Sequence, residues 1–136
     1  MFRLLDDCTL VAGQIGAGDI AEAKALGVTM IINNRPDGEE PGQPSAAEIE
    51  AATLAAGLDY RHIPVAGGLS LDQIQTMAAA LDEAGGKTLA FCRSGTRSTY
   101  LWALARKARG GDGAEIMHLA AEAGYDLSPL QGLLLR

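Results

Sequence analysis

The chain has 136 residues, of which 48% are hydrophobic and 21% charged, and it carries a formal net charge of −6 at pH 7. This length and composition predict one folded globular domain over residues 1–136 and argue against intrinsic disorder. The negative charge argues against nucleic acid or an anionic membrane as partner, because both attract clustered Lys and Arg.

Short apolar runs alternate with helical patterns along the first half of the chain. Residues 9–13 predict a strand, and residues 19–26 predict a helix that ends at Gly27. Residues 28–33 are β-branched and apolar on both faces, which is typical of a central parallel strand. Residues 34–44 contain too much Pro and Gly for regular structure, and a loop of that length usually has a function.

The second half repeats the alternation. Ser45 and Ser70 each precede a Glu or Gln by three residues, so both predict helix starts with capping boxes. Pro64 places the strand that contains it at a sheet edge or at its own end. The remaining predicted elements are strands at residues 58–65 and 88–91 and helices at residues 98–109, 114–123 and 129–135.

This order predicts an α/β fold with a small, mainly parallel sheet flanked by helices on both faces. Sites in such folds lie beyond the carboxyl ends of the strands. Cys92 follows the last predicted strand, and the loop at residues 34–44 follows an earlier one. We therefore expect both to border one pocket.

The segment after the last predicted strand has the chemistry of an anion-binding loop with a reactive thiol. A thiolate is stabilised by helix N-termini, backbone N–H groups and guanidinium groups. Gly95 permits a turn that points N–H groups inward, and Arg97 can hold an oxyanion with two hydrogen bonds. The segment predicts Cys92 as nucleophile. Its predicted anion-binding residues are Arg93, Ser94, Gly95, Thr96 and Ser98.

The alternative for Cys92 is a buried core cysteine followed by a polar helix cap. Cys8, the other cysteine, has no cationic neighbours, and we expect no catalytic role for it. The two histidines and two cysteines show no metal-binding spacing, so we expect neither metal nor cofactor. The sequence shows no membrane span or signal peptide, and we expect a cytoplasmic location without membrane association.

Four stretches, at residues 11–14, 32–39, 60–65 and 92–98, resemble the bacterial beta-lactamase hydrolase-like protein phosphatase-like domain family. That family is related to the protein tyrosine and dual-specificity phosphatases. The resemblance implies a cysteine-phosphatase fold and hydrolysis of a phosphomonoester or phosphoprotein without a cofactor. It also implies that Cys92 attacks phosphorus, that Arg97 holds the phosphoryl oxygens and that an aspartic acid protonates the leaving group.

The sequence departs from the dual-specificity pattern in two places. Four residues separate Cys92 from Arg97, where that pattern has five, and Ser98 stands where its arginine would be. The usual acid after the Ile-Pro-Val strand end is absent. Asp37, from the loop at residues 34–44, is the predicted replacement, and Glu39, Glu40 and Asp72 are weaker candidates. The alternative for Asp37 is a solvated turn residue before Gly38.

Two other functions stay open at this point. The shorter loop has the length found in rhodanese-type sulfurtransferases, which would carry a persulfide on Cys92, although other rhodanese stretches are absent. The loop could also bind an anion without turnover. The expected substrate is therefore a phosphate-, sulfate- or persulfide-bearing molecule.

Overall fold

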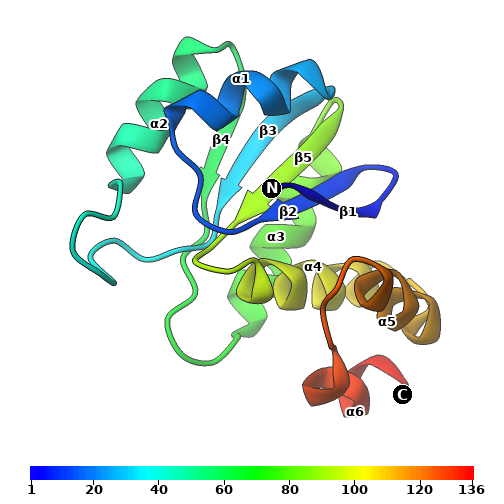
Figure 1. Ribbon diagram of the computed structural model, residues 1–136. Coiled ribbons are helices and arrows are strands. Elements are labelled where there is room, and N and C mark those ends of the chain that lie inside the picture. Colours follow the sequence, from blue (N-terminus) through cyan, green and yellow to red (C-terminus); the bar gives the residue numbers. More distant parts are fainter.

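The computed structural model describes residues 1–136 and places a five-stranded sheet at the centre of the molecule (Figure 1). The strand order is β1-β2-β5-β3-β4, in which β1 runs antiparallel to β2 and all other neighbours are parallel. The strands are β1 (Arg3–Asp6), β2 (Thr9–Ala12), β3 (Val28–Asn33), β4 (Asp59–His62) and β5 (Lys87–Phe91). The predicted mainly parallel sheet is confirmed.

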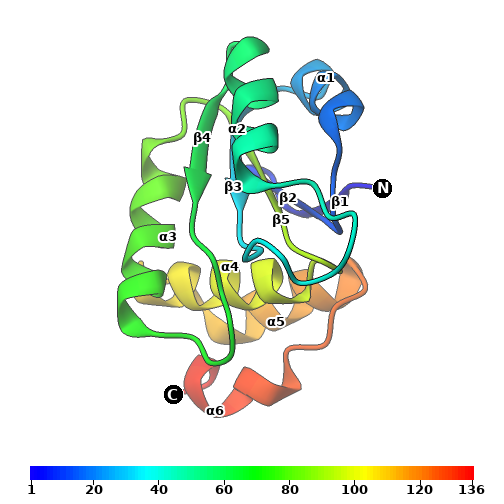
Figure 2. The same ribbon diagram turned by 90° about the vertical axis from the view of Figure 1, so that its left-hand side faces the viewer.

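Helices cover both faces of this sheet, as predicted. Figures 1 and 2 show α1 and α2 on one face and α3, α4 and α5 on the other. None of these helices has the length and apolar character that crossing a membrane requires. The helices are α1 (Ala17–Ala25), α2 (Ala46–Ala55), α3 (Leu71–Glu83), α4 (Thr96–Ala108), α5 (Gly113–Glu122), a 3₁₀ turn (Ser128–Leu130) and α6 (Gln131–Leu134).

Two apolar clusters fill the layers on the two faces of the sheet. Side chains alternate along β3, so Met30 and Ile32 join the cluster under α3, α4 and α5, while Ile31 joins the one under α1 and α2. Along β5, Ala90 and Leu89 divide in the same way. Burial on both faces explains why these two central strands are continuously apolar in sequence.

Local signals fixed several element ends where the sequence predicted them. Ser70 and Gln73 form a reciprocal capping box at the start of α3, and the Ser45 hydroxyl accepts from the Glu48 N–H at the start of α2. Gly27 follows α1 with a φ of 95°. Pro64 follows β4, which is the edge strand that this proline indicated.

Several elements differ from the prediction. Helix α1 begins at Ala17, β4 covers only part of the strand predicted at residues 58–65, and the helix predicted at residues 129–135 is a 3₁₀ turn followed by the short α6. Strand β1 was not predicted, because it is only four residues long, lies at a sheet edge and buries a single side chain, Leu5. Helix α4 begins at Thr96, two residues before the predicted start. Gly95 precedes it in the left-handed region with a φ of 91°, so the turn into the helix is completed earlier than the apolar periodicity indicates.

Candidate active site

Cys92 lies at the carboxyl end of β5, a central strand of the sheet, and its side chain is fully buried. Its Sγ accepts a hydrogen bond from the Gly95 N–H at 3.1 Å. The loop is also tied to the segment after β2, because the Gln14 N–H donates to the Arg93 carbonyl oxygen at 3.3 Å. A Cβ at Gly13 would come within 2.9 Å of that same oxygen, so only glycine permits this close approach.

The loop contains a group of backbone donors that have no acceptor in the chain. The first helical hydrogen bond of α4 runs from the Thr99 N–H to the Gly95 oxygen at 2.9 Å, which leaves the preceding N–H groups free. Such N–H groups at the N-terminus of a helix attract anions. The unpaired N–H groups belong to Arg93, Ser94, Thr96, Arg97 and Ser98.

Arg97 projects from the first turn of α4 and is held from one side. Its Nη1 donates to Glu39 Oε2 at 2.7 Å and to the Val65 oxygen at 2.8 Å, and its Nη2 donates to Glu39 Oε1 at 2.8 Å. A guanidinium has five N–H donors. The Nε–H and one Nη2–H are therefore free, and these two lie on the same edge of the guanidinium.

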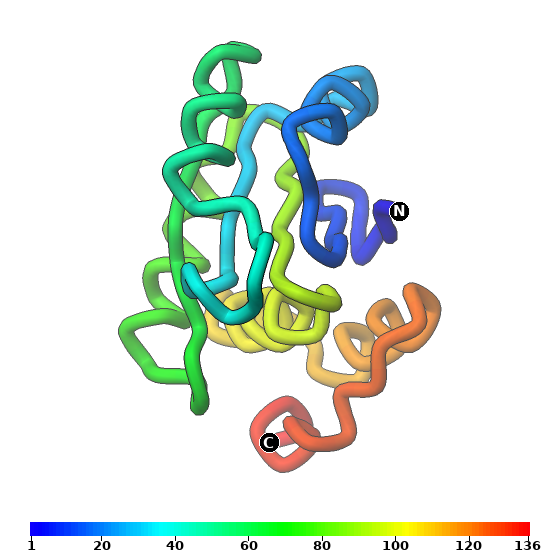
Figure 3. Tube along the Cα trace, turned by 60° about the vertical axis from the view of Figure 1, so that its left-hand side comes forward, coloured from blue at the N-terminus to red at the C-terminus, as the bar shows by residue number.

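Glu39 belongs to the loop at residues 34–44, which lies beside the turn at residues 92–95 (Figures 2 and 3). Hydrogen bonds from Arg97, and then from Arg35, lower the pKa of Glu39 to about 2, although partial burial opposes this. Glu39 in turn contributes most to the raised pKa of Arg97, and charge on Cys92 adds to it. Glu39 is thus an anion at neutral pH and not a proton donor, which removes it from the acid candidates.

Arg35 is the buried centre of this charged group, with its side chain only 1% exposed. It donates to Glu39, Glu40 and Gln14, each at 2.9 Å. Burial alone would lower the pKa of Arg35, but the two carboxylates raise it above its ordinary value. Arg35 and Glu39 therefore form an ion pair at 2.9 Å.

Arg93, in contrast, is largely exposed and lies 3.8 Å from Glu40, which also binds Arg35. The hydrogen bond from Arg35, followed by the charge of Arg93, lowers the pKa of Glu40. Glu40 is therefore also an anion in this group. Arg93 remains available at the surface of the predicted anion loop.

The hydroxyl groups of the loop have different surroundings. Ser94 Oγ donates to Thr96 Oγ1 at 3.1 Å, and both side chains are at the surface. Ser98 is buried and its Oγ donates to Asn34 Oδ1 at 2.8 Å, while Asn34 Nδ2 donates to the Ile63 oxygen at 2.9 Å. The Ser98 hydroxyl thus joins α4 to the ends of β3 and β4, and only its N–H is free for an anion.

Asp37 lies exposed on the loop at residues 34–44 and accepts a hydrogen bond from the Ala46 N–H at 2.7 Å. That contact secures the first turn of α2 with one carboxylate oxygen, Oδ1, and the other oxygen makes no hydrogen bond. Asp72 occupies the first turn of α3, where a negative charge is favourable. His62 is hydrogen-bonded within the fold, with its Nε2 donating to the Arg35 oxygen at 3.0 Å.

Tyr125, which follows α5, reaches the loop at residues 92–98 from the far end of the chain. Its hydroxyl donates to the Ser94 carbonyl oxygen at 3.1 Å. The ring is partly buried against the larger apolar cluster. No pattern in the sequence pointed to Tyr125, because its partner lies 31 residues away and no motif surrounds it.

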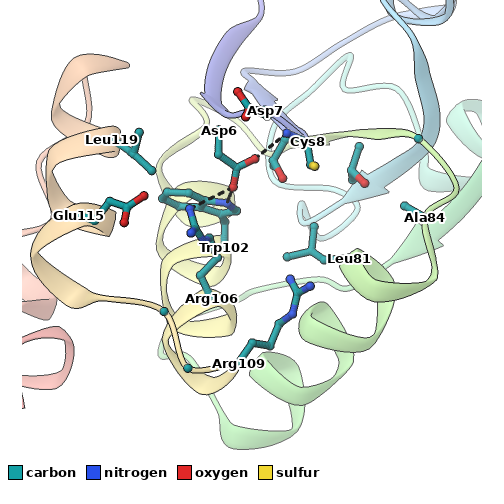
Figure 4. A pocket seen from close by; sticks show the side chains of 15 residues that line it. Asp6, Asp7, Cys8, Leu81, Ala84, Trp102, Arg106, Arg109, Glu115 and Leu119 are labelled. Carbon is teal, nitrogen blue, oxygen red and sulfur yellow. Dashed lines mark hydrogen bonds and ion pairs between the residues drawn. The ribbon is translucent and has the colours of Figure 1, made fainter.

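A cavity of about 590 Å³ opens at the opposite end of the sheet, where β2 and β5 begin. Cys8, Trp102, Arg106 and Arg109 line it (Figure 4). Asp6 accepts from both the Trp102 and the Arg106 side chains, so its charge is already paired. None of the predicted site residues borders this cavity, which places Cys8 away from Cys92.

Comparison with known sequences supports the resemblance seen in the four stretches. The family described as "Beta-lactamase hydrolase-like protein, phosphatase-like domain" matches residues 1–109. A beta-lactamase hydrolase-like protein of Agrobacterium fabrum is 38% identical over 119 residues, which make up 86% of this chain and 28% of that protein. A relative of the same name from Xylella fastidiosa is 36% identical over an equal span. The chain thus spans less than a third of the length of these relatives.

Solved structures agree with this assignment. The crystal structure of a candidate phosphatase of Neisseria meningitidis has a TM-score of 0.84 and 33% identity, covering 97% of this chain and 94% of that one. Human DUSP28 has a TM-score of 0.71 at 18% identity, covering 98% of this chain and 90% of that one, and shows the fold alone. The fold is that of the protein tyrosine and dual-specificity phosphatases, and the chain belongs to the beta-lactamase hydrolase-like protein, phosphatase-like domain family.

Proposed function

We propose that the chain hydrolyses phosphomonoesters, on small molecules or on phosphoproteins, through the thiolate of Cys92. The observation that carries this proposal is the hydrogen bond from the Gly95 N–H to Cys92 Sγ, within a loop whose neighbouring N–H groups have no other acceptor. A hydrogen bond to sulfur favours the thiolate, and free N–H groups around it suit the oxygens of a phosphoryl group.

In this mechanism the Cys92 sulfur attacks phosphorus, a sulfur–phosphorus bond forms, and the ester oxygen leaves with the electron pair of the broken bond. Arg97 binds two non-bridging oxygens through its free Nε–H and Nη2–H, while Glu39 holds the other edge of the guanidinium. Backbone N–H groups of the loop, including that of Ser98, donate hydrogen bonds to the remaining non-bridging oxygen. Water then attacks the phosphocysteine, which releases phosphate and restores the thiolate.

Asp37 is the proposed general acid, which gives its proton to the leaving oxygen and takes one from the attacking water in the second step. Its place on the loop that also carries Glu39 supports this role, since Glu39 contacts Arg97 directly. One carboxylate oxygen of Asp37 is free to make that transfer while the other stays bound to the Ala46 N–H.

The family relationship favours phosphoryl transfer over sulfur transfer. The Neisseria protein, which covers nearly the whole chain, is named as a phosphatase candidate. The short spacing between Cys92 and Arg97 and the Cys-Arg-Ser-Gly-x-Arg-Ser pattern of residues 92–98 are the features shared with rhodanese-type enzymes. The two functions can be distinguished by measuring phosphate release and persulfide formation at the same residue, Cys92.

The experiment compares para-nitrophenyl phosphate hydrolysis by the wild type and by Cys92→Ser, with Cys8→Ser as the matched control. We expect turnover to fall by at least roughly 10³-fold in Cys92→Ser and to persist in Cys8→Ser. Equal turnover in the wild type and Cys92→Ser would exclude Cys92 as nucleophile.

Intact mass spectrometry after exposure to thiosulfate or glutathione persulfide completes the test. A gain of one sulfur atom on Cys92 without phosphate release would replace this proposal with sulfur transfer. Phosphate or sulfate binding without turnover on any donor would instead indicate an anion-binding module.

A further inference from the structure

The peptide group between Ser94 and Gly95 makes two hydrogen bonds at its opposite ends. Its carbonyl oxygen accepts from the Tyr125 hydroxyl at 3.1 Å, and its N–H donates to Cys92 Sγ at 3.1 Å. The peptide group is planar, with its C=O and N–H pointing in opposite directions. Any contact that fixes the carbonyl therefore also fixes the direction of the N–H.

This peptide needs such a contact, because the residue after it is a glycine. Gly95 has a φ of 91°. Glycine adopts positive and negative φ about equally readily, so Gly95 alone does not hold the peptide in one orientation. A Cβ at Gly95 would overlap the Tyr125 hydroxyl and lie 3.0 Å from the ring carbon Cζ. The tyrosine thus occupies the space directly against the turn.

Tyr125 is itself held firmly. Its N–H donates to the Ala120 oxygen at 2.9 Å, and Arg3 Nη1 donates to the Ala123 oxygen at 3.0 Å, which ties the end of α5 to β1. Burial of the ring raises the pKa of Tyr125; the charge of Arg3 opposes this, and charge on Cys92 adds to it. The hydroxyl therefore keeps its proton and acts as a donor at neutral pH.

We propose that Tyr125 is a positioning residue for Cys92, which acts by holding the Ser94–Gly95 peptide so that its N–H points at the sulfur. Donation to the carbonyl also strengthens the N–H of the same amide as a donor. This inference rests on the proposed function for its catalytic meaning, but the link between Tyr125 and the thiolate does not depend on turnover. Tyr125 lies beyond residues 1–109, the part that matches the family.

The test measures alkylation of Cys92 by iodoacetamide as a function of pH, in a Cys8→Ser background so that a single thiol reacts. Tyr125→Phe keeps the ring and removes the hydroxyl. Tyr100→Phe is the matched control, because Tyr100 also packs against the larger cluster but its hydroxyl makes no hydrogen bond. Circular dichroism and Trp102 fluorescence confirm that each variant is folded.

We expect the midpoint of the alkylation profile to move upward by about half a pH unit in Tyr125→Phe, with about a threefold slower reaction below the midpoint. Tyr100→Phe should follow the parent profile. An unchanged profile in Tyr125→Phe, or an equal shift in both variants, would overturn the inference.

The same variants assayed with para-nitrophenyl phosphate distinguish the two proposals. A shifted alkylation profile in a protein without phosphatase turnover would uphold the role of Tyr125 and reject the proposed function. Reduced turnover with an unshifted profile would reject the role of Tyr125 and leave the proposed function standing.

Discussion

At the scale of single residues, the acidic side chains near Cys92 fall into two groups: those hydrogen-bonded to arginines and those without a cationic partner. Glu39 and Glu40 accept from arginines, which lower the pKa of both carboxyl groups. A carboxylate held in this way orients a guanidinium but cannot supply a proton at neutral pH. Asp37 has no cationic partner and keeps one free oxygen, so it stays the proposed acid.

Replacing Asp37 with Asn tests that assignment when two substrates are compared whose leaving groups differ in their need for a proton. Hydrolysis of phenyl phosphate should slow about 10²-fold, because the phenoxide needs a proton to leave. Hydrolysis of para-nitrophenyl phosphate should slow much less, because nitrophenoxide leaves without one. Asp72→Asn, on the first turn of α3, should match the wild type on both substrates. An equal loss on both substrates in Asp37→Asn would argue for a structural effect at α2.

At the scale of elements, the loop at residues 34–44 is held against the loop at residues 92–98 by buried charge rather than by apolar packing. Arg35 binds three acceptors from two segments, and Glu39 continues the contact to Arg97 on α4. A buried guanidinium that lost these partners would carry a large desolvation cost. The loop is therefore fixed in one position relative to Cys92, although its sequence contains no regular structure.

Arg35→Lys should destabilise the fold by about 2–4 kcal/mol, because an ammonium group cannot match the three acceptors in the fork geometry of arginine. The comparison is Arg93→Lys, which should change stability by no more than about 0.5 kcal/mol since Arg93 is exposed. Urea unfolding followed by the fluorescence of Trp102, the only tryptophan and a fully buried one, measures both. Similar losses in the two variants would contradict the central role of Arg35.

At the scale of the whole molecule, the carboxylates of this charged group make stability depend on acid. The pKa of Glu39 is about 2 in the folded chain against an ordinary value of 4.5. A carboxyl group whose pKa is lowered by folding contributes its full stabilisation at a pH above its ordinary pKa. That contribution is lost as the pH falls toward the pKa of the folded state. The chain should therefore lose stability from this source between about pH 4.5 and about pH 2.

Glu39→Gln isolates this effect. The variant should be less stable than the wild type near neutral pH, and the difference in unfolding free energy should shrink as pH falls below about 4.5, because a protonated Glu39 resembles glutamine. Glu50→Gln, on the exposed side of α2, should follow the wild type over the same range. A difference between Glu39→Gln and wild type that stayed constant from neutral pH into this range would contradict the ion-pair explanation.

Features that depend only on neighbouring residues could be predicted from the sequence. Hydrogen bonds between Ser70 and Gln73, the glycine after α1 and the double-sided apolar pattern of β3 all act over a few positions. The parallel sheet, its flanking helices and the place of Cys92 at a strand end followed from these signals. Strand β1 and the start of α4 did not, because the first is short and the second is set by one glycine conformation.

Which side chains meet around the cysteine depends on how the chain folds. Arg97 and Glu39 are 58 positions apart, and Tyr125 and Ser94 are 31 apart. Such pairs cannot be predicted from composition or residue spacing, because each pair depends on how the helices pack on the sheet and on the reach of the side chains. The charged group around Arg35 and the tyrosine behind Gly95 are therefore visible only once the chain is folded.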